Sequence, residues 1–218
     1  MAVVGFLVKV AAFLLIFMTK VAADNHSLSV SDKLFKEATD LVKSKKYEKA
    51  VKIFEELANS NEHDAQYNLA ILLKAGKGKT RKYTDALYWS FLSKLGEIPE
   101  ANDLVDDLID LLPEKTVEEI RQKVKTKLEN NVETGGEESI MHLGKFFLDV
   151  VTEKEYASAY KWFTVGAALG LNQAIALRDE VEEELTPEQI VEEQENAEIF
   201  FRSFIEQLEE ALDEENNS

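Results

Sequence analysis

The chain has 218 residues and a formal net charge of −17, which fits one domain and argues against nucleic-acid binding, because phosphates would be repelled. Hydrophobic residues make up 45%, too many for a disordered chain, and the absence of cysteine excludes disulfides, thiolate zinc sites and cysteine nucleophiles. With only 9 glycines and 3 prolines the chain lacks the turns of a β-sandwich or barrel, so the composition favours helices.

The first 23 residues have the pattern of a secretory signal. An apolar run from Val10 to Met18 follows Lys9, and small residues precede a predicted cut before Asp24. We therefore expect export, to the periplasm in a Gram-negative bacterium and through the secretory route elsewhere. The alternative is an uncleaved segment that anchors the protein in a membrane. Residues 24–30 then form a short linker.

An internal repeat dominates the rest of the chain. Lys46–Ala50 recurs as Lys82–Ala86 and again as Glu155–Ala159, at offsets of 36 and 73 residues. Several further residues stay in register at an offset of 73 to 74, such as Gly96 with Gly170. A fixed period of this length is typical of stacked helix pairs, each of which cannot bury its apolar face alone.

The spacing within each repeat predicts helices. Tyr83, Ala86 and Trp89 lie three residues apart and fall on one helical face, where the small alanine lets a neighbouring helix approach. Glycines at the ends, including Gly96 and Gly170, are expected at C′ positions. The packing positions predicted in this way are Tyr47, Ala50, Ala65, Tyr83, Ala86, Trp89, Gly96, Ala101, Tyr156, Ala159, Trp162, Gly170 and Ala174.

Five helix hairpins account for the helical repeat domain, which we expect to span residues 31–212. They are predicted at 31–59, 63–95, 99–129, 138–169 and 172–212, followed by an acidic disordered tail at 213–218. The second helix of the third hairpin lacks the Tyr-x-x-Ala motif but keeps an apolar stripe at Val117, Ile120, Val124 and Leu128. Asn130–Glu137 is then the longest loop and the expected hinge.

These residues resemble the Sel-one-like repeat, a relative of the tetratricopeptide repeat. The resemblance covers about residues 31–200 and rests on Ala65-x3-Leu69, Gly76-x-Gly78, Asp85-Ala86-x2-Trp89 and Leu95-Gly96, with a second copy in Ser139-x3-Leu143-Gly144, Ala159-x2-Trp162 and Ala167-Ala168-x-Gly170. It implies an all-α, right-handed α-solenoid that scaffolds protein complexes and is often exported in bacteria. The chain departs from the pattern in the third hairpin and at Val150–Thr152, which lacks the Gly-x-Gly of the first copy.

Chemical motifs are weak in this sequence. Ala75–Thr80 resembles a phosphate loop, but the glycine expected five residues before Gly78 is Leu73, so we expect a helix end and a turn. His26, His63 and His142 are far apart and lack a histidine at i+4 or an HExxH pattern, so we expect no metal site. We likewise expect no catalytic residues and no cofactor.

Two charged features have open interpretations. The loop after residue 73 is basic and is either a solvated turn, a patch for an anionic partner, or a contact with the acidic C-terminal helix; its residues are Lys74, Lys77, Lys79, Arg81 and Lys82. From Asp179 to Ser218 there are 16 acidic residues and one arginine, which carry most of the net charge. The apolar stripe Phe200, Phe204, Leu208 and Leu212 in this segment favours a capping helix over a dimer contact.

The sequence therefore predicts an exported, non-catalytic scaffold that binds a protein or peptide and no nucleic acid, with membrane contact only if residues 1–23 are retained. Two alternatives remain open: a membrane-tethered assembly factor, and an exported hydrolase that uses an unrecognised acidic site. The sequence does not identify the partner or the oligomeric state.

Overall fold

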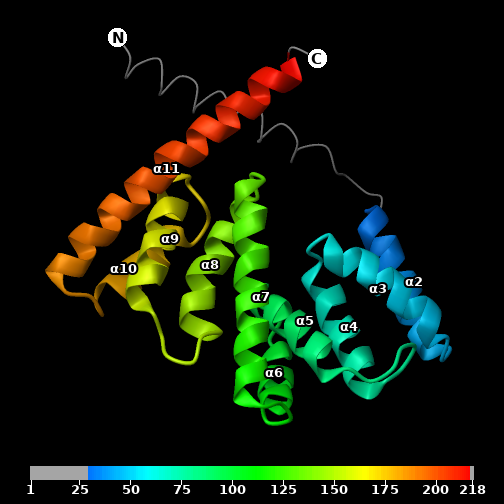
Figure 1. The fold of residues 1–218 in the computed structure, drawn as a ribbon. Coiled ribbons are helices and arrows are strands. Elements are labelled where there is room, and N and C mark those ends of the chain that lie inside the picture. The colour runs from blue at the N-terminus through cyan, green and yellow to red at the C-terminus, as the bar shows by residue number, and fades with distance from the viewer. Residues whose placement is uncertain (1–28, 217–218) are drawn as a thin grey trace.

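The computed structural model describes residues 29–216, and within that range the chain forms ten helices and no strand. The helices are α2 (Val30–Lys43), α3 (Tyr47–Asn59), α4 (His63–Ala75), α5 (Tyr83–Leu95), α6 (Ala101–Ile109), α7 (Glu114–Glu133), α8 (Glu137–Asp149), α9 (Tyr156–Ala168), α10 (Ala174–Glu182) and α11 (Pro187–Asn216). They follow one another across the molecule in chain order (Figure 1). Of the five consecutive pairs that the sequence predicts, α2–α3, α4–α5 and α8–α9 pack directly on each other, whereas α6 and α7 both pack on α5, and α10 and α11 both pack on α9. The predicted signal segment, residues 1–23, lies outside the described residues.

Local signals explain where several helices begin. Ser29 caps α2 through a reciprocal capping box with Asp32, in which each side chain accepts from the backbone N–H of the other residue. Thr186 and Gln189 form the same kind of box at the start of α11, where Pro187 is the first helical residue. In each Tyr-x-x-Ala motif the tyrosine is the first residue of its helix, α3, α5 or α9.

Most contacts join helices that are neighbours in the chain, with two branch points. Helix α5 contacts α4, α6 and α7, and helix α9 contacts α8, α10 and α11. The chain thus contains two units of four helices: unit one, α4–α7, and unit two, α8–α11. The first three helices have 13, 13 and 9 residues in both units, whereas the fourth has 20 in unit one and 30 in unit two.

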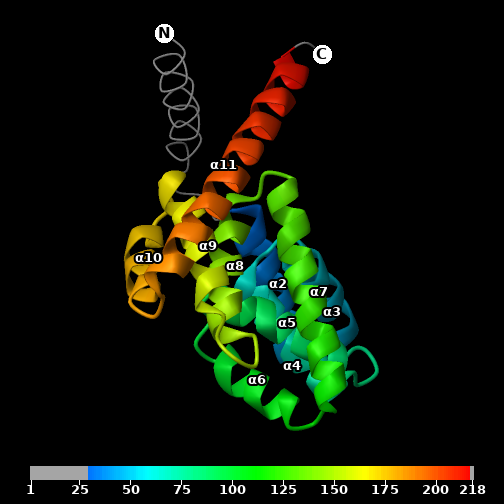
Figure 2. The same cartoon turned by 60° about the vertical axis from the view of Figure 1, so that its left-hand side comes forward.

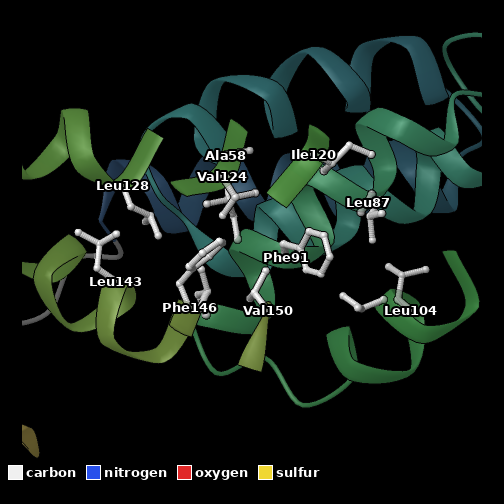
Figure 3. Packing of buried hydrophobic residues seen from close by; sticks show 14 of the residues in the cluster. Ala58, Leu87, Phe91, Leu104, Ile120, Val124, Leu128, Leu143, Phe146 and Val150 are labelled. Carbon is white, nitrogen blue, oxygen red and sulfur yellow. The ribbon is translucent and has the colours of Figure 1, made fainter. Parts of the chain in front are cut away.

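One continuous apolar core runs through the stack from α2 to α11. Figure 3 shows its middle part, where residues of α5, α7 and α8 meet. Small residues lie at its tightest points, since all six alanines at the repeat positions have no exposed surface: Ala50, Ala65, Ala86, Ala101, Ala159 and Ala174. The aromatic residues at the repeat positions lie at the edges of this core, where they are mostly half-buried. The alanines let neighbouring helices approach closely, and the aromatic side chains fill the space beside them, so the stacked helices pack densely.

Three expectations about helix ends are wrong. The segment Asn130–Glu137 is no long loop, because α7 continues to Glu133 and only three residues connect it to α8; Val132 extends the buried stripe by one more turn. Gly96 is not a left-handed C′ residue, since its φ is −78° and the left-handed residue is Glu97. The predicted boundary of the repeat domain at residue 212 falls inside α11, which continues to Asn216.

Helix α11 folds back along α9, which agrees with the expected capping role. Phe200 stands edge-on to Trp162 with ring centroids 4.9 Å apart, and Phe204 beside it is almost fully buried. Beyond these contacts the helix extends past the body of the molecule (Figures 1 and 2). Among the helices of residues 29–216, none combines the length and apolar composition needed to cross a bilayer.

Candidate functional site: a hollow between the two units

A hollow lies where the two units meet. It has a volume of about 700 Å³ and is lined by the start of α4, the end of α5, the connection between α7 and α8, and α8 itself. Its polar side chains include His63, Glu97, Glu138, His142 and Lys145. We call this site the inter-unit hollow.

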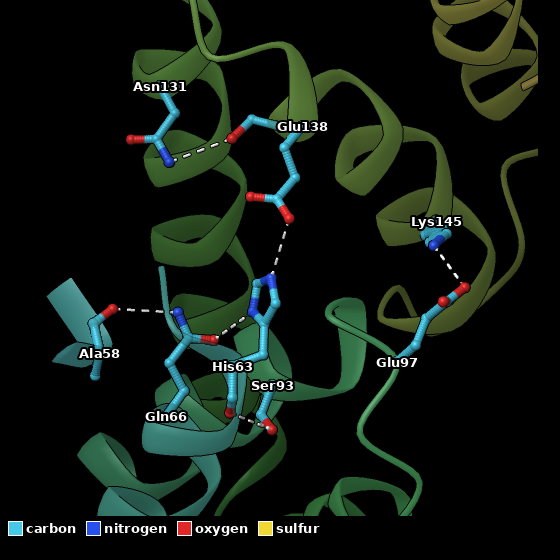
Figure 4. A network of polar contacts seen from close by, with 9 residues as sticks. Ala58, His63, Gln66, Ser93, Glu97, Asn131, Glu138 and Lys145 are labelled. Atoms are coloured by element: carbon cyan, nitrogen blue, oxygen red, sulfur yellow. Dashed lines mark hydrogen bonds and ion pairs between the residues drawn. The ribbon is translucent and has the colours of Figure 1, made fainter. Parts of the chain in front are cut away.

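His63, the first residue of α4, is held by a chain of hydrogen bonds (Figure 4). The buried Gln66 amide donates through Nε2 to the carbonyl of Ala58 at 3.2 Å, which leaves its Oε1 facing His63 Nδ1 at 3.0 Å. Because that oxygen can only accept, Nδ1 carries the proton. The other ring nitrogen, Nε2, therefore points away from the core and toward Glu138.

Gly96 makes room for this ring. A Cβ atom at Gly96 would lie 2.0 Å from Cγ of His63 and 2.3 Å from its Cδ2, far inside any real contact distance. Because the backbone of Gly96 is in an ordinary conformation, glycine is needed at this position for space and not for a turn.

Glu138 and His142 approach His63 from α8. They are four residues apart, so they lie on one face of that helix. Glu138 Oε1 is 3.4 Å from His63 Nε2, and the rings of His63 and His142 stand edge to face with centroids 5.1 Å apart. One donor atom from each of the three residues can be chosen so that all lie within 4.8 Å of one another, which is a spacing able to hold a cation.

The three groups respond differently to their surroundings. Burial lowers the pKa of His142 to about 4, so its imidazole is neutral at physiological pH. Burial also disfavours the charged form of His63, but its hydrogen bonds to Glu138 and Gln66 outweigh that effect and raise its pKa. The hydrogen bond from His63 lowers the pKa of Glu138, which therefore stays ionised.

A second ion pair crosses the same hollow. Lys145 Nζ of α8 lies 2.8 Å from Glu97 Oε1, in the residue that follows α5 and Gly96. The lysine lowers the pKa of the Glu97 carboxyl through a hydrogen bond and its charge. Asn131, near the end of α7, donates to Ser139 Oγ at 3.2 Å, which ties α7 to α8 beside the hollow.

For the basic loop the sequence allows a solvated turn, a partner patch or a contact with the C-terminal helix, and in the structure its side chains make contacts within the chain. Lys74 pairs with Asp107 at 2.7 Å, Lys82 pairs with Asp85 at 2.9 Å, and Lys79 pairs with Glu55. The remaining two cations lie over tyrosine rings: Lys77 over Tyr47 and Arg81 over Tyr83. In the described part of the chain, none of these five side chains pairs with α11.

The grouping of His63, Glu138 and His142 is absent from the sequence-based expectations. Those expectations treated the histidines as separate, but the stacking of unit two on unit one brings two of them together. A signal was present in Glu138-x3-His142, a carboxylate and an imidazole at i,i+4 on one helix. The missing third member lies 75 residues away from Glu138, a contact that no local pattern indicates.

Comparison with known proteins adds little. No protein-family model matches the chain, and no curated protein matches it. Among solved structures it is similar to c5321, a protective antigen present in uropathogenic Escherichia coli strains that displays an SLR fold. The two are 18% identical with a TM-score of 0.29, over 73% of this chain and 41% of that one. The chain thus spans less than half of that neighbour, and the assignment of the fold rests on the ten helices themselves.

Proposed function

We propose that the chain is an exported, non-catalytic scaffold that binds a second protein at the inter-unit hollow. The observation that carries this proposal is the make-up of the hollow, which is open to solvent and lined by residues from Asn61 to Asn172, drawn from both units. Stacked helical repeats present extended surfaces of this kind, on which an extended segment or a protein edge can lie across several elements.

The charges around the hollow favour a basic partner. Three carboxylates line it, at Glu97, Glu137 and Glu138, against the single ammonium group of Lys145. The chain as a whole carries a net charge of −17. Complementary charge steers association and suppresses wrong partners, so a partner segment rich in lysine or arginine suits this surface.

Site-specific photo-crosslinking tests this proposal in cells. A photoreactive residue at Asn172, exposed at the rim of the hollow, should give a discrete protein adduct. The same residue at Gln122, exposed on α7 away from the hollow, should give none. In the Asn172 background, Glu137→Lys should reduce the adduct more than Glu119→Lys, the same charge reversal at an exposed residue of α7; Glu137 itself is half-buried. Equal labelling from Asn172 and Gln122, or no adduct from either, would contradict the proposal.

Export is tested separately. Residues 1–23 lie outside the described residues, so the proposal rests on their sequence pattern alone. Mass spectrometry of the protein from the exported fraction should give a mature N-terminus at Asp24. A start at Met1 together with membrane fractionation would indicate a tethered protein instead.

We further propose that the chain is a divergent Sel-one-like repeat protein. The repeat motifs support this, because their alanines are fully buried and their tyrosines start equivalent helices. An alignment of homologues should show Ala86 and Ala159 retained together with Gly96 and Gly170. Free variation at the two alanines would remove the basis for the assignment.

A further inference from the structure

We propose that His63, Glu138 and His142 form a binding site for one divalent transition-metal ion of the zinc class. The proposal goes beyond partner binding and does not depend on it. It rests on two observations in the inter-unit hollow. Two hydrogen-bond acceptors, on His63 and Glu138, face each other, and the His142 ring beside them makes no hydrogen bond.

The facing acceptors are His63 Nε2 and Glu138 Oε1. The Gln66 amide places the ring proton on Nδ1, so Nε2 presents a lone pair. A carboxylate oxygen lies only 3.4 Å from that lone pair. Two acceptors at this distance repel each other unless a cation lies between them. The candidates are a second proton on His63 or a metal ion.

His142 distinguishes these two candidates. Within the described residues its ring makes no hydrogen bond, although the residue is only 8% exposed and lines the hollow. A proton shared by His63 and Glu138 leaves His142 without a role in the site. A metal ion can accept the lone pair of the His142 ring as a third ligand, which gives the buried ring a partner.

The donor set fits zinc and its neighbours in the periodic table. Two imidazole nitrogens and one carboxylate oxygen suit zinc, whereas magnesium and calcium prefer sites made only of oxygen. Zinc–ligand distances of about 2.0–2.2 Å place tetrahedral ligand atoms roughly 3.5 Å apart. Ligand atoms that lie up to 4.8 Å from one another must therefore draw together by about 1 Å on binding. The Glu138 side chain is 60% exposed, so it has the freedom to make this movement.

The surroundings of His63 match those of a metal ligand. Metal-binding histidines commonly donate their other ring N–H to an oxygen acceptor, which fixes the tautomer and orients the ring. Gln66 does this for His63, and its own amide is anchored to Ala58. Gly96 leaves the space that the ring occupies.

The experiment is a titration of the untagged full chain, since a histidine tag would bind metal itself. After chelator treatment and dialysis, zinc added at pH 7.5 should bind at one ion per chain by calorimetry, and magnesium should not bind. Cobalt should bind at the same ratio and give the visible absorption bands of a low-coordinate site.

Variants then assign the site. Glu138→Gln is exposed and should fold normally, yet it should weaken zinc binding strongly, as should His142→Gln. Gln66→Leu should cost about 10–100-fold in affinity, the usual effect of removing an outer partner of a histidine ligand. Gly96→Ala should weaken binding because the added Cβ displaces the His63 ring, although it removes no ligand atom. The matched control is His26→Gln, the same substitution at the only other histidine, which should change nothing.

Two results would overturn the proposal. If the wild-type chain binds no zinc at one equivalent, a proton alone separates His63 from Glu138. If zinc binds but Glu138→Gln leaves the affinity unchanged, or His26→Gln abolishes binding, the ion lies elsewhere. Circular dichroism of each variant confirms that a loss of binding is not a loss of fold.

Discussion

The two four-helix units solve the same packing problem with different residues. Both close the loop between their first two helices with an equivalent hydrogen bond: Lys82 N–H donates to the Leu73 carbonyl in unit one, and Glu155 N–H donates to the Phe147 carbonyl in unit two. In unit one this loop contains two glycines with positive φ, Gly76 and Gly78. Unit two lacks them, and its loop is held by Arg121, whose Nε donates to the Val150 carbonyl at 2.6 Å.

The helix interfaces show the same kind of exchange. Ala70 of unit one corresponds to Gly144 of unit two, and Ser90 corresponds to Phe163. From unit one to unit two, the first position becomes smaller and the second becomes larger. A Cβ atom at Gly144 would lie 2.3 Å from Cε1 of Phe163. Gly144 therefore leaves the space that the Phe163 ring occupies, so the two differences between the units depend on each other.

The end of the second helix differs between the units in a way that concerns the site. Gly96 is the C-cap residue of α5 and adjoins the His63 ring, whereas the C-cap of α9 is Leu169. Gly170 lies one position further on and is left-handed, like Glu97 after α5, and a Cβ there would meet nothing within 4 Å. Gly170 thus serves the turn, and Gly96 makes space for a ring. The comparison teaches that buried small residues set the frame of the repeat, while chemistry appears where the copies differ.

The largest expected effect tests the shared frame. Ala86→Leu in unit one and Ala159→Leu in unit two each add three carbons at a site with no exposed surface. Both should lower the free energy of unfolding by roughly 3 kcal/mol, the upper part of the range for overpacking. Denaturant titration measures this. Ala176→Leu, at an exposed alanine of α10, is the control and should be near neutral.

Arg121 should come next. Arg121→Leu removes the charged donor that holds Val150 and Thr152, so the free energy of unfolding should fall by about 2 kcal/mol. Arg202→Leu on α11, the fourth helix of the other unit, removes only an exposed i,i+4 pair and should cost under about 0.5 kcal/mol. Equal losses in the two variants would mean that Arg121 does not secure the loop.

Gly144→Ala sharpens the comparison of interfaces. Alanine is the better helix former by roughly 1 kcal/mol, but the clash with Phe163 should exceed that gain and leave a net loss of about 1 kcal/mol. In a Phe163→Leu background the same substitution should cost less, because the smaller side chain can yield. A double-mutant cycle by thermal unfolding gives the coupling, and strict additivity would contradict it.

The smallest effect concerns the ion pair across the hollow. Lys145 lowers the pKa of Glu97 in the folded protein, so the pair contributes stability above about pH 4.3, the ordinary value for glutamate, and loses it as the pH falls through the folded pKa. Because Glu97 is 63% exposed, the contribution should stay below about 0.5 kcal/mol. Metal-free wild type and Glu97→Gln should differ at pH 7 in low salt and converge at pH 3.

Most of the fold was predictable, because its information is local. Spacing of three and four residues identified the helical faces, and the repeat of Tyr47, Tyr83 and Tyr156 identified equivalent helix starts. The error at Asn130–Glu137 arose because polar residues and two glycines obscured Val132, which continues the stripe of α7. The polar residues around Val132 indicated a loop, whereas α7 in fact continues past Val132 to Glu133.

The candidate site was not predictable in the same way. It depends on how far unit two is rotated and shifted on unit one, which places Glu138 opposite His63. Gly96 shows the limit clearly: its sequence context indicates a turn, but its actual reason is a ring from another helix that no local window contains.

Contacts that join mainly successive helices also set how this molecule responds to force. In a globule, pulling on the two termini loads many interlocked elements at once. Here α2 and α11 belong to opposite ends of a series, so tension passes from one helix pair to the next. The chain should lengthen in steps under a steady pull, with unit one and unit two yielding as separate events of similar extension.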